Sequence, residues 1–401
     1  MRINSCQFND SYFPIMDGVG MVAHNYAYWL NIKYGKSCLV APMVKGYSDQ
    51  VDYKVIRFKS VILPGMNPYR IGLPFIDFEF RENLTKFQFD ILHTHCPFIS
   101  GHLALRLARK HKIPLVTTLH SKYRIDFEKT IGNKALVRFL MKMLIGFYNQ
   151  ADHVWVPNWS TGRTLREYGF TGNFEIMHNG TDIKIPEKSK YQKLRRNGLE
   201  AIDAKDDDFI LLFVGQHRWE KNLKMIIDSL HIMKSRGETF KMIFVGEGNA
   251  EEDMRKLVKK YELTDDVRFI GVISDRSKLM DIYACSDLFV FPSVYDTSPL
   301  VIREAAAFDI PCIIIRNSST AEEVQDNVNG FLIDNTKEAL AQKIIELKQN
   351  PQAIKNAGIN ARKSLYRSWE SVVDEVYINY DVIIRNHSKN PESHGGSKKI
   401  N

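Results

Sequence analysis

Residues 287–304, Asp-Leu-Phe-Val-Phe-Pro-Ser-Val-Tyr-Asp-Thr-Ser-Pro-Leu-Val-Ile-Arg-Glu, contain a strand, a loop and a helix start in direct succession. The apolar run 288–291 is short and rich in β-forming residues, as a buried strand is, and Pro292 with Ser293 ends it. Thr297 and Ser298 offer hydroxyl caps for a helix, and Pro299 suits its first turn. This order is typical of parallel α/β proteins.

Two acids in this stretch suggest a binding site. Asp296 lies in the loop, and Glu304 lies about one turn inside the helix. Free N–H groups at a helix start can hold a phosphate, and carboxylates can accept hydrogen bonds from sugar hydroxyls. An ordinary strand-to-helix turn with two solvated acids explains the stretch equally well, so the rest of the chain has to decide.

Strand-like and helix-like segments alternate along the chain, which predicts an α/β fold of two tandem, doubly wound, Rossmann-like domains. Residues 184–208 are highly charged and indicate a linker. We expect an acceptor-binding domain at 1–190, a donor-binding domain at 205–368, a helix crossing back at 369–385 and a disordered tail at 386–401. In such a pair the ligand cleft lies between the domains, at the carboxyl ends of the strands. The expected strands are 2–8, 37–41, 54–58, 89–93, 114–119, 153–156, 174–177, 209–214, 241–245, 267–270, 288–291, 312–315 and 330–333.

Length and composition agree with a soluble two-domain protein. The chain has 401 residues, 44% of them hydrophobic and 25% charged, and no apolar run is long enough to span a bilayer. Its start, MRINSCQFND, lacks the order of a signal peptide. The cysteines are scattered without metal-ligand spacing, which predicts free thiols in a reducing cytoplasm. They are Cys6, Cys38, Cys96, Cys285 and Cys312.

The first half of the chain is basic. Residues 1–200 hold 28 Lys or Arg against 16 Asp or Glu, which favours a phosphate-bearing partner or an anionic membrane surface. We expect no nucleic-acid partner, because no base-reading module is present.

Helix-like residues 133–150 carry Lys134, Arg138 and Lys142 along one edge and a wide apolar stripe elsewhere. This helix either lies on a membrane surface or is buried on two sides. The apolar loop 64–80 is either a second membrane contact or a packed cover.

Several loops that follow predicted strands carry groups suited to a phosphorylated sugar. Gly18, between the first strand and helix, lets the backbone approach a phosphate. His93 and His95 suggest a metal, but a third ligand at suitable spacing is missing, so we expect none. His120 is the better candidate, as a hydrogen-bond donor to a ligand hydroxyl. Arg218 and Lys221 suit a pyrophosphate, although the loop lacks the Walker pattern.

The ordered set of these motifs resembles retaining glycosyltransferase family 4, with the GT-B fold. The resemblance covers roughly residues 1–380. The motifs that carry it are Asp17-Gly18-Val19, 95–98, Thr118-Leu119-His120, 156–160, Asn179-Gly180-Thr181-Asp182, 215–222, Phe269-Ile270-Gly271 and the acid pair with Glu304-Ala305-Ala306-Ala307.

The resemblance implies a role for each matching position. Arg218 and Lys221 would stabilise the leaving diphosphate, and Asp296 would hold hydroxyls of the transferred sugar. Glu304 would accept from the ribose. The remaining implied contacts are a phosphate cradle from the N–H groups of Leu300 and Val301, base recognition near Val272, closure by Gly18, and orientation of the sugar by His120.

Two positions depart from the family pattern. The first acid is normally Glu but is Asp296 here, one methylene shorter, which leaves the donor sugar open. Asp17 replaces the first glycine of the commoner Gly-Gly pair, so the backbone of the first loop is expected to have less conformational freedom.

The resemblance implies metal-independent, front-face transfer of a hexose with retention, without a cofactor. The donor would be a nucleotide-sugar, with UDP as the expected nucleotide, and the acceptor a glycan or lipid in cell-envelope synthesis. The expected location is cytoplasmic, either free or at the inner face of a membrane. The alternatives are another GT-B enzyme, such as a nucleotide-sugar epimerase or a phosphorylase, and a non-catalytic nucleotide-sugar-binding protein.

Overall fold

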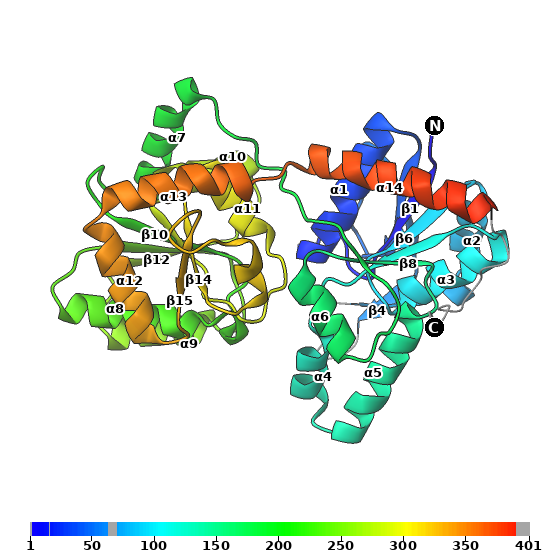
Figure 1. Cartoon of the computed structure of the whole chain (residues 1–401), viewed down its shortest axis with the longest axis horizontal. Helices are drawn as coiled ribbons and strands as arrows, with labels where there is room; N and C mark the ends of the chain where they lie inside the picture. Colours follow the sequence, from blue (N-terminus) through cyan, green and yellow to red (C-terminus); the bar gives the residue numbers. More distant parts are fainter. Residues whose placement is uncertain (1, 16, 63–69, 390–401) are drawn as a thin grey trace. The chain divides into compact units, whose positions relative to one another are not determined.

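The computed structural model describes residues 2–15, 17–62 and 70–389. It divides into two compact units, shown in Figure 1. The first unit consists of Met1–Gly180 together with Trp369–Asn401, and the second of Thr181–Ser368. The chain therefore leaves the first unit at Gly180, ahead of the expected boundary at residue 190, and returns to it through its last helix.

The first unit is built on a parallel sheet of seven strands, in the order β3-β2-β1-β6-β7-β8-β9. The order reverses between β1 and β6, which makes their carboxyl ends the switch point at which such folds bind ligands. The strands are β1 (Ser5–Phe8), β2 (Ser37–Pro42), β3 (Lys54–Phe58), β6 (Ile91–Thr94), β7 (Leu115–Thr118), β8 (His153–Val156) and β9 (Glu175–Ile176).

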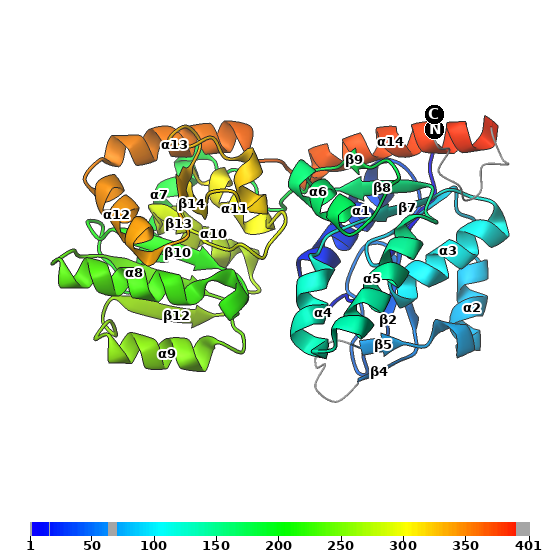
Figure 2. The same ribbon diagram turned by 60° about the horizontal axis from the view of Figure 1, so that its bottom comes forward.

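Helices lie on both faces of this sheet, as Figures 1 and 2 show together. They are α1 (Gly18–Lys33), α2 (Phe78–Thr85), α3 (Ile99–His111), α4 (Tyr123–Ile131), α5 (Lys134–Tyr148), α6 (Trp159–Glu167) and the last helix, α14 (Trp369–Lys389). Helix α14 packs along α1, where Tyr34 and Tyr377 stack with ring centroids 3.8 Å apart. It continues to Lys389, so residues 386–389, expected to be disordered, are helical; residues 390–401 lie outside the described part.

A small antiparallel hairpin, not expected from the sequence, pairs β4 (Ser60–Ile62) with β5 (Arg70–Gly72). It is followed by a 3-10 turn, η1 (Pro74–Ile76). The hairpin and this turn fall within or beside the apolar loop expected at 64–80. Residues 63–69 lie outside the described residues, so the expectation for that loop stays a prediction there.

The second unit repeats the same plan. Its six parallel strands have the order β12-β11-β10-β13-β14-β15, with the switch point between β10 and β13. They are β10 (Ile210–Val214), β11 (Lys241–Val245), β12 (Val267–Gly271), β13 (Leu288–Val290), β14 (Cys312–Ile315) and β15 (Phe331–Ile333). Strands β10, β13 and β14 are completely buried, which explains why they are continuous apolar runs.

The helices around the second sheet include one that the charge pattern concealed. Residues 184–208 were expected to be a linker, but α7 (Lys188–Ala201) lies within them and packs against α10 (Arg276–Cys285). The two helices approach closely at Gly198, where a Cβ atom would lie 2.0 Å from the carbonyl oxygen of Asp281. The other helices are α8 (Leu223–Ser235), α9 (Glu251–Lys260), α11 (Leu300–Ala307), α12 (Lys337–Lys348) and α13 (Pro351–Ser364), with 3-10 turns η2 (Trp219–Lys221) and η3 (Ser319–Glu323).

The predicted fold class is confirmed, and every strand expected from the sequence is present to within a few residues at its ends. All five cysteines are free thiols, and four of them are buried.

Candidate active site

Two loops of the second unit meet at its switch point. Strands β10 and β13 are neighbours in the sheet, so the segments that follow them leave from the same edge. The first segment leads through η2 to Lys221, and the second leads through Pro292 and Ser293 to Asp296. The sheet order therefore brings together two residues 75 positions apart.

Lys221 and Asp296 form an ion pair. The Lys221 ammonium lies 2.7 Å from Oδ1 and 2.8 Å from Oδ2 of Asp296. The hydroxyl of Ser293 donates a further hydrogen bond of 2.6 Å to Oδ2. The side chains of Lys221 and Asp296 are only 12% and 18% exposed, so water screens this pair less than a surface pair.

Arg218 lies beside this pair with its guanidinium 5.3 Å from the centre of the Tyr295 ring. Its Nε lies 3.5 Å from a carboxylate oxygen of Glu220. The stacking on Tyr295 connects Arg218 to the loop that carries Asp296. The predicted trio of Arg218, Lys221 and Asp296 is thus assembled from two neighbouring loops.

The start of α11 differs from the expectation. Thr297 and Ser298 were expected to cap this helix, but Pro299 occupies the N-cap position, and its side chain makes no capping hydrogen bond. The helix begins at Leu300, so both residues precede the N-cap position. The first turn of α11 includes the N–H groups of Leu300 and Val301, and a helix start of this kind can hold an anion.

Glu304 is buried in a polar cluster of the same unit. Its Oε2 accepts a 2.8 Å hydrogen bond from the hydroxyl of Tyr283, and its Oε1 accepts one of 2.8 Å from Arg276. Arg276 also binds the carboxylate of Asp182. Glu304 and Asp182 raise the pKa of Arg276 against the effect of burial. The Glu304 carboxylate is therefore held in one orientation by two donors.

Sequence reasoning assigned no role to Arg276, Tyr283 or Asp182. Arg276 and Tyr283 are seven positions apart on α10, a spacing that places them on one face of a helix. A cation and a hydroxyl at this spacing, next to the acid-bearing stretch, were the available signal.

Glycines allow the loops at this edge to pack closely. A Cβ on Gly246 would lie 2.1 Å from the carbonyl oxygen of Gly215, and one on Gly248 would lie 2.4 Å from that of His217. Gly271 has a φ of +79°, in the left-handed region that glycine tolerates. Val272, which follows it and was expected to lie near the base, is 52% exposed.

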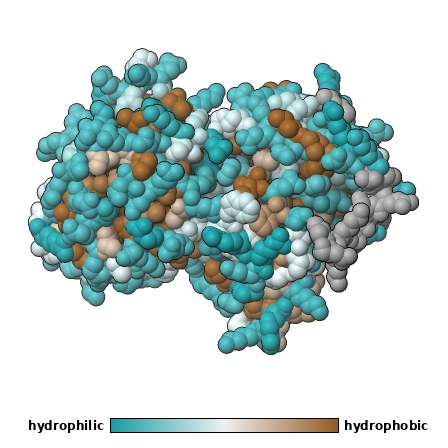
Figure 3. All heavy atoms as spheres, viewed as in Figure 1, coloured by the Kyte–Doolittle hydropathy of each residue, from teal (hydrophilic) through white to brown (hydrophobic). Residues whose placement is uncertain are grey.

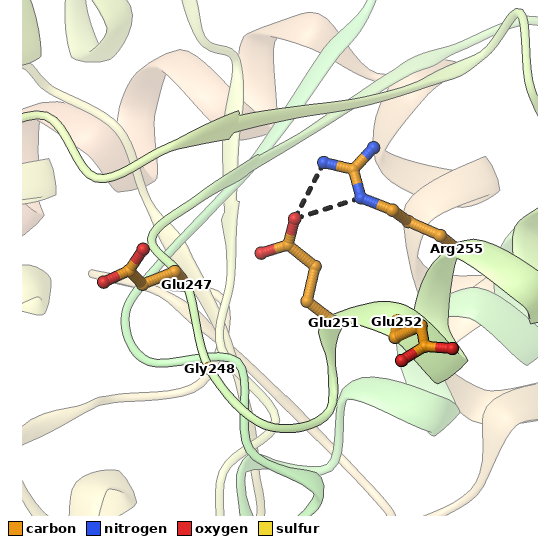
Figure 4. A pocket seen from close by; sticks show the side chains of 5 residues that line it. All are labelled: Glu247, Gly248, Glu251, Glu252 and Arg255. Carbon is orange, nitrogen blue, oxygen red and sulfur yellow. Dashed lines mark hydrogen bonds and ion pairs between the residues drawn. The ribbon is translucent and has the colours of Figure 1, made fainter. Parts of the chain in front are cut away.

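A surface hollow nearby is unsuited to a diphosphate. Glu247, Gly248, Glu251, Glu252 and Arg255 line it (Figure 4). Figure 4 shows Arg255 turned toward Glu251, whose Oε1 accepts two hydrogen bonds from it, of 3.0 and 2.7 Å. Since its one cation is paired with Glu251 and the carboxylates of Glu247 and Glu252 also line the hollow, it would repel an anion. The ion pair and the start of α11 are the better candidate for a phosphate site.

His120 belongs to the first unit and is buried there beside two other histidines. Its Nε2 lies 3.1 Å from Nδ1 of His95, and the ring of His95 stacks on that of His93. Burial lowers the pKa of His120 to about 3, so this imidazole is neutral at pH 7. The three histidines are hydrogen-bonded to protein groups, which argues against a shared metal.

Gly18 opens α1 in the first unit, and a Cβ there would meet no atom within 4 Å. The preceding residue, Asp17, is the N-cap: it accepts a 2.6 Å hydrogen bond from the N–H of Gly20. The hydroxyl of Ser11 donates to the same carboxylate. The replacement of a glycine by Asp17 therefore fixes the helix start, while Gly18 still allows close approach.

Among the described residues, no group of three or more His, Cys, Asp or Glu side chains could hold a metal ion. In the same part of the chain, no helix combines the length and the apolar character that crossing a membrane requires.

Two family models match the chain, one for each unit. Residues 16–185 match the model described as Glycosyltransferase Family 4, and residues 196–364 match Glycosyl transferases group 1. An alpha-monoglucosyldiacylglycerol synthase of Acholeplasma laidlawii is 24% identical over 395 residues, covering 95% of this chain and 98% of its own. A GDP-mannose-dependent alpha-mannosyltransferase of Corynebacterium glutamicum is 22% identical, covering 94% of this chain and 88% of its own.

Solved structures share the fold. Sucrose-phosphate synthase from Thermosynechococcus elongatus superimposes with a TM-score of 0.78 at 18% identity, over 96% of this chain and 100% of its own. HepE of Anabaena, solved in complex with UDP-glucose, gives a TM-score of 0.74 at 15% identity, over 95% and 100%.

Proposed function

The chain belongs to glycosyltransferase family 4, has the GT-B fold and is a hexosyltransferase. From this we propose that it moves a hexose from a UDP-sugar to a hydroxyl of a membrane-associated acceptor. We also propose that the transfer retains the configuration of the sugar. The observation that carries the proposal is the Lys221–Asp296 pair, which lies in the loops that lead to η2 and to the start of α11. Cations and free N–H groups suit a diphosphate, and a carboxylate suits sugar hydroxyls.

In the proposed mechanism the acceptor hydroxyl attacks the anomeric carbon from the face that the diphosphate leaves. The bond from the anomeric carbon to the phosphate oxygen breaks, the new glycosidic bond forms, and the hydroxyl proton passes to the departing phosphate. Negative charge develops on the diphosphate, and Lys221, Arg218 and the N–H groups of Leu300 and Val301 stabilise it. These groups supply the neutralising charge, so the reaction needs no metal or other cofactor.

The nucleoside is held through Glu304 and through backbone near Val272. Glu304 accepts from the ribose hydroxyls, because Arg276 and Tyr283 take up one lone pair on each of its oxygens and each carboxylate oxygen has two. Uridine is the proposed base. Support comes from HepE, a solved structure with the same fold that was determined with UDP-glucose. The roles expected of His120 and Gly18, which belong to the first unit, stay predictions.

The first unit offers a surface for an anionic membrane. Leu136, Phe139 and Met143 on α5 are 45%, 57% and 52% exposed, so this face of the helix is not buried on its second side. Lys134, Arg138 and Lys142 are exposed on the same helix. Apolar side chains flanked by cations are the pattern of a helix that lies in a headgroup layer. On the face drawn in Figure 3, apolar side chains likewise lie among hydrophilic ones.

The acceptor is proposed to be a glycolipid or another lipid-linked envelope component. The relative from Acholeplasma laidlawii is named for a glucosyldiacylglycerol, and its similarity covers almost the whole of both chains. A lipid acceptor would also explain an amphipathic face on the first unit.

The test is a transfer assay with UDP-, GDP- and ADP-hexoses and vesicles that contain diacylglycerol or glycosyl-diacylglycerol, with and without EDTA. We expect turnover with a UDP-hexose, an α-linked product from an α-linked donor by NMR, and no effect of EDTA. An inverted product, or complete loss of activity in EDTA, would contradict the proposed mechanism.

A further inference from the structure

Arg276 of the second unit binds two carboxylates at once. Its Nε donates a hydrogen bond of 2.9 Å to Oδ2 of Asp182, and its Nη2 donates to Oδ1 of the same carboxylate. The same Nη2 also donates, over 2.8 Å, to Oε1 of Glu304. One guanidinium is therefore shared between the carboxylate proposed for the ribose and a second carboxylate, 94 positions before it in the chain, that the proposed function does not use.

The place of Arg276 in its helix is unusual. It is the first residue of α10, and the N-cap residue Asp275 accepts a hydrogen bond of 2.9 Å from the N–H of Ser277. The N-terminus of a helix carries a partial positive charge, so a cation in the first turn is unfavourable for the helix itself. The two carboxylates that Arg276 binds give a reason for this position that the stability of α10 does not.

Asp182 lies between two residues that are held firmly in the same unit. The N–H of Thr181 donates to the carbonyl oxygen of Arg367 over 2.8 Å, and the N–H of Ile183 donates to the hydroxyl of Thr181 over 3.0 Å. Thr181 and Ile183 are 2% and 1% exposed. The backbone on both sides of Asp182 is therefore fixed, and its carboxylate can serve as an anchor for the guanidinium.

This anchor limits how Arg276 approaches Glu304. The two N–H groups that Asp182 accepts, on Nε and on Nη2, lie on the same edge of the planar guanidinium. The plane is thereby held, and the second N–H of Nη2 is the one that reaches Glu304. Without Asp182 the same edge would be able to turn to Glu304 and form a pair of two parallel bonds, the geometry that arginine and a carboxylate favour.

The sharing also leaves negative charge at Glu304. Two carboxylates face one guanidinium, so the three ionised side chains together carry one net negative charge. The Glu304 side chain is only 6% exposed, so water compensates little of this charge. Arg276 and Tyr283 each donate to one oxygen of Glu304, and each carboxylate oxygen has a second lone pair. A charged acceptor of this kind suits two neighbouring hydroxyls.

Resting on the proposed function, we propose that Asp182 is a positioning residue. It holds Arg276 so that Glu304 keeps the orientation and the negative charge with which it accepts from the 2′- and 3′-hydroxyls of the ribose. Asp182 acts through Arg276, so this role needs no contact between Asp182 and the nucleotide. Loss of Asp182 should therefore weaken the binding of nucleotides that have both hydroxyls and spare nucleotides that lack them.

Calorimetric titration of the full chain with two nucleotides tests the proposal. We expect Asp182→Ala to raise the Kd of UDP by about tenfold, the loss typical of a hydrogen bond to a charged group, and to leave the Kd of 2′,3′-dideoxy-UDP unchanged. Asp182→Glu, which retains a carboxylate, should recover part of the affinity for UDP. A loss that is equal for both nucleotides would overturn the proposal.

Asp206→Ala is the matched control. Asp206 is also an aspartate of the second unit that pairs with an arginine, Arg195, at 3.7 Å, and its side chain is 90% exposed. Its replacement should leave the Kd of both nucleotides unchanged. Asp182→Asn, which keeps the size of the side chain and one acceptor oxygen, is the second variant and should show a smaller loss for UDP alone. Equal thermal midpoints would show that the variants are folded.

A double-mutant cycle separates action through Glu304 from a general effect on the unit. In the Glu304→Gln background, Asp182→Ala should raise the Kd of UDP by less than about twofold, because the charged acceptor that Asp182 serves is already lost. Independent effects would multiply instead. A full tenfold effect of Asp182→Ala in this background would overturn the proposal.

The Nε–H group of Arg276 gives a readout that needs no nucleotide. In ¹⁵N-arginine-labelled protein its signal is the one lost in Arg276→Lys. We expect this signal to shift in Asp182→Ala, which removes the acceptor at 2.9 Å, and to stay in place in Asp206→Ala. An unshifted signal in Asp182→Ala would overturn the inference. A wild type that shows the shift on loss of Asp182 but binds no UDP would overturn the proposed function instead.

Discussion

The ammonium of Lys221 lies within 2.8 Å of both carboxylate oxygens of Asp296, so one cation faces a whole carboxylate. Under the proposed function these two groups have different ligands, a phosphate for Lys221 and a sugar hydroxyl for Asp296. Without a bound donor the two charges neutralise each other, and few water molecules contact them because both side chains are largely buried. A bound diphosphate would take the place of the carboxylate at the ammonium, which leaves Asp296 able to accept from the sugar.

Removal of the Lys221 cation should reduce transfer strongly. We expect Lys221→Ala to lower kcat by about 10²–10³, the loss typical when one group that stabilises developing charge is deleted. Lys224→Ala is the matched control, because Lys224 is an exposed lysine one turn away that pairs only with Asp228 among the described residues. Steady-state rates with the preferred donor are the measurement. Equal kcat values for both variants would contradict the role of Lys221.

Asp296→Glu should change the choice of sugar more than the binding of the nucleotide. Asp296 contacts both Lys221 and Ser293, and a side chain one methylene longer moves the carboxylate into the space proposed for the sugar. We expect the ratio of kcat/KM between two UDP-hexoses to change by about tenfold or more, the scale that one methylene produces in a fitted pocket. The Kd of UDP, measured by calorimetry, should stay the same. A weaker Kd with an unchanged ratio would place Asp296 at the phosphate.

Glu304→Gln should weaken nucleotide binding through the ribose. The variant keeps the size of the side chain and an oxygen for the Tyr283 hydroxyl, but loses the charge that faces Arg276. We expect the Kd of UDP to rise by about tenfold, the loss for a hydrogen bond to a charged group. The comparison is with 2′,3′-dideoxy-UDP, which should bind wild type and variant equally. A variant that still prefers UDP to its dideoxy form would contradict the ribose contact.

The sequence predicted the two sheets well because buried parallel strands are continuous apolar runs. Strand β14 is an example, since Cys312 to Ile315 are all buried. The linker predicted there was wrong at α7, whose surface is so polar that few buried residues, such as Leu199 and the C-cap residue Ile202, reveal the face against the core. The predicted caps Thr297 and Ser298 were also wrong. Which residue caps a helix depends on where the helical backbone angles begin, and a sequence pattern locates that point only to within one or two residues.

The candidate site was predictable only in part, for a similar reason. Lys221 and Asp296 follow adjacent strands, and the order of strands in a doubly wound sheet predicts that their loops meet. The clamp on Glu304 was not predictable, because Arg276 lies in a different helix and Asp182 in a loop without regular structure. Side-chain hydrogen bonds between such segments depend on packing distances, which spacing along the chain does not encode.

The exposed face of α5 should bind anionic vesicles. We expect the protein to float with vesicles that contain anionic lipid at low salt, and a triple change of Leu136, Phe139 and Met143 to Ser to abolish flotation. Replacing Lys134, Arg138 and Lys142 by Gln should weaken it and reduce its salt dependence, since each cation near the surface is worth about 1 kcal/mol.

The control for this face lies on α14, where Ile378 and Val382 are 61% and 50% exposed. Their replacement by Ser removes exposed apolar side chains from another helix and should leave flotation unchanged. If the α5 and α14 variants lose flotation equally, binding is a general property of apolar surface. If the wild type does not float at all, the membrane surface is not a partner.

Asp10 should make the stability of the first unit depend on pH. Its Oδ1 accepts a 2.9 Å hydrogen bond from the N–H of Ser100, while its Oδ2 is covered and has no hydrogen-bond partner among the described residues. Burial raises the pKa of this carboxyl from 3.8 to about 6. The folded chain therefore holds a proton on Asp10 between pH 3.8 and 6, when the unfolded chain has lost it. The contribution of Asp10 to stability consequently falls as the pH rises through this window.

Asp10→Asn removes the charge and keeps an oxygen for Ser100. We expect it to gain about 2 kcal/mol of unfolding free energy relative to wild type between pH 4 and pH 7, since each unit of pKa shift corresponds to about 1.4 kcal/mol. Urea unfolding at pH 4, 5, 6 and 7 gives the difference. Asp10→Ala, which also loses the bond from Ser100, should be less stable at every pH but should show the same trend relative to wild type. A difference that stays constant with pH in both variants would show that the carboxyl does not titrate in this window.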